Sequence, residues 1–142
     1  MDDPYHLERF VEAQSGTFDL ACAELRRGLK TGHWMWFIFP QIAGLGFSGM
    51  SQRYAIASLD EARAYLAHPM LGPRLRKICG IVNTIEGRTA YQIFGSPDDM
   101  KLRSSTTLFA HATEQNAEFV EVIRKYFGGV EDARTVELMG SE

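Results

Sequence analysis

Residues 58–82 read SLDEARAYLAHPMLGPRLRKICGIV, and this stretch decides the fold class. Ser58 and Glu61 have the spacing of a capping box, in which a hydroxyl and a carboxylate satisfy free amides at the start of a helix. Apolar residues then recur at intervals of three and four up to His68-Pro69, and again after Gly72-Pro73. This spacing is typical of helices that bury one face. The stretch therefore predicts two consecutive amphipathic helices.

Helix signals continue on both sides of this stretch. Ser96-Pro97-Asp98-Asp99 combines a capping hydroxyl, a proline and two carboxylates that the helix dipole favours. Further helices are expected from Pro4 to Gln14, after Thr17, after Asn116 and after Asp132. Trp36 to Phe39 is the one candidate strand, and a single strand cannot make a sheet. We predict one compact, mainly α domain over residues 1–142, with about five to seven helices and room for a small β hairpin near residues 33–42.

Length, composition and charge exclude several classes of protein. The 142 residues are close to the commonest size for one domain, and 45% hydrophobic residues exclude wholesale disorder. A net charge of −3 without a basic stripe argues against a nucleic-acid partner. The most apolar window, residues 34–39, is too short to cross a membrane, and the acidic start is unlike a secretory signal. We expect a cytoplasmic protein with neither nucleic acid nor membrane as its partner.

The spacing of the cysteines and histidines does not indicate a metal site. Cys22 and Cys79 each lie among apolar residues at helical spacing, which predicts two buried thiols rather than a disulfide. The four histidines are scattered, without the close pairs that zinc sites use. We therefore predict neither a metal nor a cofactor.

Residues 33–41, HWMWFIFPQ, contain four aromatic rings in six consecutive positions. Such density is typical of a core segment, since large rings supply much buried area. The alternative is a stacking platform for a planar ligand, formed by Trp34 and Trp36, with His33 and Gln41 as neighbouring hydrogen-bonding groups. The sequence alone leaves both interpretations open.

Residues 44–49, GLGFSG, match the glycine pattern of dinucleotide-binding turns. The match fails on its context, because Pro40 interrupts the approach and no amphipathic helix follows directly. A glycine-rich loop whose amides face an anion is the milder hypothesis. Its candidate ligand-binding residues are Gly44, Gly46, Ser48 and Ser51.

Residues 98–107, DDMKLRSSTT, form the second dense polar region. Four consecutive hydroxyls are unfavourable within a helix unless they bond back by one turn or bind a specific partner. Lys101, Ser104 and Ser105 suit a phosphate, and Asp99 is the candidate carboxylate for activating water. The alternative is an ordinary solvated helix face.

Four segments together resemble a bacterial family designated domain of unknown function 1810, some of whose members are labelled calpastatin. They are HWMWFIFPQIAGLG, SQRYAIASLDEARAYLAHPMLGPRL, FGSPDDMKLRSSTTLF and FVEVIRKYFGGVEDARTVELM, which span nearly the whole chain. One departure is Thr106, where the family pattern has methionine. The resemblance implies a mainly helical fold and no particular activity. EARAYLAHPMLGPRL is also similar to a segment of the NADAR group, which resembles N-glycosidases acting on ADP-ribose derivatives or riboflavin precursors.

These observations lead to one functional expectation and one alternative. We expect an intracellular domain that binds a nucleotide or ADP-ribose-like ligand bearing phosphate. If it is an enzyme, we expect an N-glycosidase-type hydrolase that cleaves this ligand. The alternative is a non-catalytic protein-interaction domain that uses the aromatic segment. The NADAR group's catalytic residues have no counterpart here, so whether the chain is an enzyme stays open.

Overall fold

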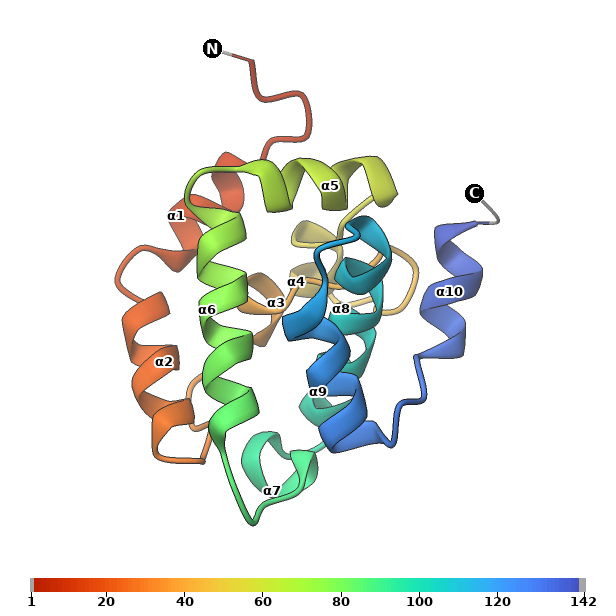
Figure 1. Cartoon of the computed structure of the whole chain (residues 1–142). Coiled ribbons are helices and arrows are strands. Elements are labelled where there is room, and N and C mark those ends of the chain that lie inside the picture. The colour runs from red at the N-terminus through yellow and green to blue at the C-terminus, as the bar shows by residue number, and fades with distance from the viewer. Residues whose placement is uncertain (1, 141–142) are drawn as a thin grey trace.

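The structure, a computed structural model, describes residues 2–140 and consists of helices joined by short loops (Figure 1). The ten helices of this part of the chain are α1 (Glu8–Gln14), α2 (Phe18–Arg26), α3 (Met35–Ile38), α4 (Gly49–Arg53), α5 (Leu59–Ala67), α6 (Leu71–Thr84), α7 (Ala90–Phe94), α8 (Asp98–Ala112), α9 (Ala117–Phe127) and α10 (Ala133–Met139). None of them is both long and apolar enough to cross a membrane. The mainly α prediction is confirmed, whereas the predicted count of five to seven helices is wrong.

The predicted hairpin near residues 33–42 is wrong as well. The candidate strand from Trp36 to Phe39 lies mostly in the short helix α3, and no strand occurs within residues 2–140. An isolated parallel bridge joins Ile42 to Ile56 instead. A short apolar run does not distinguish strand from helix by its period, and one helical turn buries Met35 and Ile38 together.

Helix α8 lies at the centre of the fold and packs against α5, α7, α9 and α10 (Figure 1). A line of rings runs through this core from α1 to α9. The centroids of Phe10 and Tyr65 lie 5.2 Å apart, those of Tyr65 and Phe109 lie 5.2 Å apart, and those of Phe109 and Phe119 lie 6.1 Å apart. All four side chains are fully buried, so the core holds α8 rigidly between its neighbours.

The stretch that predicted the fold class forms the two helices expected. The Ser58 hydroxyl accepts a hydrogen bond from the Glu61 amide at 3.2 Å, and α5 ends before His68. The Glu61 carboxylate accepts from Ala57 at 2.9 Å rather than from Ser58. At the start of α6, a Cβ on Gly72 would lie 2.0 Å from the α5 backbone, so only glycine permits this close approach.

The prediction of two buried thiols is confirmed, since Cys22 and Cys79 are both free and buried.

The sequence analysis did not predict three of the helices, because they have only four or five residues. Such helices are too short to show a 3.6-residue stripe. The third of them, α7, does carry a local signal, because Thr89 and Gln92 form a complete capping box.

Candidate functional site

A pocket of about 320 Å³ lies between the loop and helix of residues 41–51, the first half of α8, and Asp132, which immediately precedes α10. We call it the α8 pocket. Its lining residues are Gln41, Leu45, Gly46, Ser51, Pro97, Met100, Lys101, Ser104 and Asp132. The two polar regions that the sequence singled out therefore meet in space, although they are about fifty positions apart in the chain.

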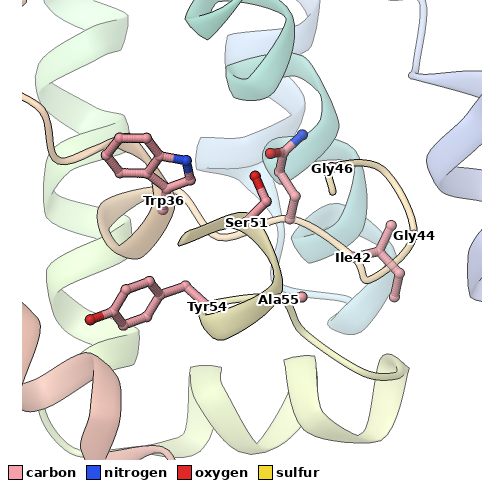
Figure 2. A pocket seen from close by; sticks show the side chains of 8 residues that line it. Trp36, Ile42, Gly44, Gly46, Ser51, Tyr54 and Ala55 are labelled. Atoms are coloured by element: carbon pink, nitrogen blue, oxygen red, sulfur yellow. The ribbon is translucent and has the colours of Figure 1, made fainter. Parts of the chain in front are cut away.

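Backbone bonds and glycines fix the loop side of the pocket. The Gln41 carbonyl accepts from the Ile56 amide at 2.8 Å, which anchors the start of the loop. Gly44 has φ +103°, a left-handed conformation that favours glycine. A Cβ on Gly46 would lie 2.6 Å from the Ser51 hydroxyl, so glycine lets the loop fold onto α4. Figure 2, which draws a smaller neighbouring cavity, also shows Gly46 and Ser51.

Ser48 and Ser51, at the start of α4, form a short chain of hydrogen bonds. Ser48 caps the helix, with its hydroxyl accepting from the Ser51 amide at 3.1 Å. The same hydroxyl donates to the Ser51 hydroxyl at 2.9 Å. Because Ser51 Oγ acts as the acceptor in that pair, the bond does not use its own proton. Ser48 itself is exposed and does not line the pocket.

Lys101 brings a positive charge to the α8 side. Its Nζ lies 5.2 Å from the Trp36 ring centroid, over the face of the indole. Asp98 lies 3.5 Å from Lys101 but only 2.8 Å from Lys30, which in turn lies over the ring of Trp34. Two lysines thus share the Asp98 carboxylate.

The consecutive hydroxyls of α8 are satisfied in different ways. Ser104 donates to the Met100 carbonyl at 3.1 Å and Thr106 to the Leu102 carbonyl at 2.8 Å, so two hydroxyls bond back one turn, which is one of the two arrangements that the sequence left open. The Ser105 hydroxyl is buried without a hydrogen-bond partner among the described residues, and Ser105 does not line the pocket.

Trp34 belongs to the core and does not line the α8 pocket. Only 2% of its surface is exposed, and its indole nitrogen donates to Glu24 at 3.0 Å. The same carboxylate oxygen accepts from the amides of Thr31 and Gly32. Burial raises the pKa of Glu24, but these three hydrogen bonds outweigh it and hold the pKa below its ordinary value. The ring therefore anchors the loop before α3, and it offers no face to a ligand.

Trp36 is half-buried and lines a smaller cavity of about 10 Å³, which shares Gln41, Gly46 and Ser51 with the α8 pocket (Figure 2). A volume of this size holds about one water molecule. The ring therefore has no room on this side for a stacked base, and its role beside the pocket is to support Lys101.

The remaining predicted residues lie elsewhere. His33 is exposed and Asp99 is half-buried, and neither lines the α8 pocket. An Asp99 carboxylate oxygen instead accepts from the Met100 amide at 2.8 Å. The carboxylate that lines the pocket is Asp132, which the sequence marked only as a helix start. Its one sequence signal was that capping role, which is confirmed by a 2.9 Å bond from the Thr135 amide.

The geometry defines a small, mainly helical protein with a mixed polar and apolar pocket at its central helix. Within residues 2–140, no three histidine, cysteine or acidic side chains lie together as a metal site would require. Residues 4–139 match a family described as protein of unknown function, DUF1810, and the chain belongs to this family.

A solved structure supports the fold independently. The chain is similar to the conserved hypothetical protein Rv1873 from Mycobacterium tuberculosis, whose crystal structure shares 54% sequence identity and a TM-score of 0.97. The similarity covers 99% of this chain and 100% of that one. A search of curated proteins found no match, so the resemblance to the NADAR group stays a prediction.

Proposed function

We propose that the α8 pocket binds the phosphate of a nucleotide or ADP-ribose-like ligand. The observation that carries this proposal is that three residues able to donate hydrogen bonds, Lys101, Ser51 and Gln41, line one pocket. A phosphate offers several acceptor oxygens and negative charge, which match this set of donors.

The position of Lys101 supports an anionic ligand, although Asp132 brings a carboxylate to the same pocket. Asp98 is nearer to Lys30 than to Lys101, so it does not neutralise both. The Lys101 side chain is about one-fifth exposed, and α8 and the ring of Trp36 hold it in place. A charge that is already positioned loses little conformational entropy on binding.

Apolar groups in the same pocket suit the rest of such a ligand. Leu45, Pro97 and Met100 line it beside the donors. Ligand pockets commonly combine an apolar wall with a few convergent polar groups, and 320 Å³ falls within their usual range of about 300–1,000 Å³. We leave hydrolysis out of the proposal because Asp99, the predicted catalytic carboxylate, does not line the pocket.

The alternative of an interaction domain built on the aromatic segment has less support. Trp34, Phe37 and Phe39 are buried, so these rings offer no surface to a partner.

Calorimetric titration of AMP, ADP-ribose and ribose 5-phosphate tests the proposal, with Lys101→Met as the variant. Methionine keeps the aliphatic stem over Trp36 and removes the charge. We expect affinity to fall by about tenfold, as loss of one charged hydrogen bond implies. Lys77→Met, an exposed lysine on α6, is the matched control. Equal affinity in wild type and Lys101→Met, or no binding of any of the three compounds by wild type, would refute the proposal.

A further inference from the structure

The α8 pocket also holds hydrogen-bond acceptors that no phosphate can use. Ser104 commits its proton to the Met100 carbonyl at 3.1 Å, so its hydroxyl presents only lone pairs to the pocket. The Asp132 carboxylate is an acceptor on both oxygens, and one of them already takes the amide and the hydroxyl of Thr135. A phosphate placed here would meet negative charge and lone pairs.

These acceptors are held as firmly as the donors. Ser104 follows Lys101 by three positions in α8, so the two side chains lie on one face of the helix. The Asp132 amide donates to the Thr107 hydroxyl at 3.0 Å, which ties the start of α10 to α8. Donors and acceptors therefore occupy one pocket in a fixed arrangement.

A ligand that fits this arrangement carries hydroxyl donors close to its phosphate. Ribose does so, and a carboxylate that accepts from ribose hydroxyls is a common means of sugar recognition. On the basis of the proposed function, we infer that Asp132 and Ser104 bind the ribose hydroxyls of the phosphate ligand. The pocket thereby selects ribose phosphates over 2′-deoxyribose phosphates.

The base contributes little to this recognition. None of the described residues that line the α8 pocket is aromatic, and the two tryptophans offer no face inside it. The volume of about 320 Å³ is near the lower end for ligand pockets. The ligand class is therefore the phosphorylated ribose unit, whatever base is attached to it.

Calorimetric titration of wild type with AMP, 2′-deoxy-AMP, CMP and ribose 5-phosphate tests this inference. We expect AMP, CMP and ribose 5-phosphate to bind within about threefold of one another, and 2′-deoxy-AMP about tenfold more weakly, as loss of a hydrogen bond to a charged acceptor implies. Asp132→Ser keeps a capping hydroxyl for α10 and removes the carboxylate. In this variant AMP should bind no better than 2′-deoxy-AMP. Asp19→Ser, at an exposed position in the first turn of α2, is the matched control.

The outcomes separate the two proposals. Equal affinity of wild type for AMP and 2′-deoxy-AMP, or a preference of more than about tenfold for AMP over ribose 5-phosphate, overturns this inference and leaves phosphate binding intact. Absence of binding of all four compounds to wild type removes the proposed function itself. The wild-type comparison does not depend on whether the Asp132 variant folds.

Discussion

Replacing Trp34 by alanine removes a buried ring together with a hydrogen bond to a buried carboxylate. The side chain is 2% exposed, and truncations of this kind cost about 3 to 5 kcal/mol of unfolding free energy. Its bond to Glu24 is 3.0 Å long, and a hydrogen bond to a charged group contributes about 1.5 to 3 kcal/mol. Glu24 keeps two backbone amides as donors. We therefore expect the upper end of the truncation range, about 5 kcal/mol, rather than the full sum.

Two companion variants separate the sources of this loss. Trp34→Phe keeps most of the ring but removes the indole donor, so it should cost about 1.5 to 3 kcal/mol. Trp36→Ala removes a half-buried ring and should cost about 1 to 2 kcal/mol. Because the ring of Trp36 supports Lys101, this variant should also weaken binding of the phosphate ligand.

Urea denaturation followed by far-UV circular dichroism measures all three variants, since that signal comes mainly from the helical backbone. A loss below about 2 kcal/mol for Trp34→Ala would refute its assignment to the core. Equal and severe losses for Trp34→Ala and Trp36→Ala would show that both rings are core and that Trp36 has no separate role at the pocket.

Three further predictions follow from packing and ionisation. Gly72→Ala should lower the unfolding free energy by about 3 kcal/mol, because its Cβ would lie 2.0 Å from backbone. Gly80 lies on the same helix with open space around it, so Gly80→Ala should raise the unfolding free energy by about 0.5 to 1 kcal/mol. Urea melts in which both variants change stability alike would contradict this account of α6 packing. Burial raises the pKa of the Cys22 and Cys79 thiols, so neither should react with a thiol reagent at pH 8 until the chain is unfolded. Rapid labelling of the native protein would contradict this prediction. Hydrogen bonds outweigh burial and hold the pKa of Glu24 below its ordinary value of 4.5, so the carboxylate stabilises the fold above pH 4.5 and loses this effect as pH falls through the folded-state pKa. The stability difference between wild type and Glu24→Gln should shrink below pH 4.5, and a constant difference in urea melts would argue against it.

The sequence predicted the elements whose signals are local. Ser58 and Asp132 each marked the start of a helix, and their side chains accept the capping hydrogen bonds there. Helix α8 also begins where predicted, at Asp98, but the predicted capping by the Ser96 hydroxyl is wrong, because the N-cap is Pro97 and no side chain caps the helix. Capping depends on a side chain and on amides two or three positions away, so a short window contains the whole interaction. Periodic apolar stripes are local in the same sense, and together these signals were sufficient for the mainly α class.

The sequence indicated only some of the residues that line the α8 pocket, for a related reason. The residue types at 41–51 and 101–104 indicated donors suited to phosphate, and the structure brings Gln41, Ser51 and Lys101 to one pocket. Asp99 and Asp132 both precede or begin helices and are not distinguishable by local pattern. Which of the two carboxylates reaches the pocket depends on how α10 is tied to α8, and no sequence window contains that contact.

The sequence by itself determined that the chain is helical, where most of its longer helices begin, and which polar groups are available. Only the tertiary structure decided that residues 35–38 form a helical turn instead of a strand, and that Trp34 is core while Trp36 supports a lysine. The physical reason is the range of the interactions. Helix capping and periodicity act within about one turn, whereas burial of a ring depends on segments that approach only when the chain folds. Trp34 meets Glu24 from the preceding helix, and Trp36 meets Lys101 from a helix sixty-five positions further along.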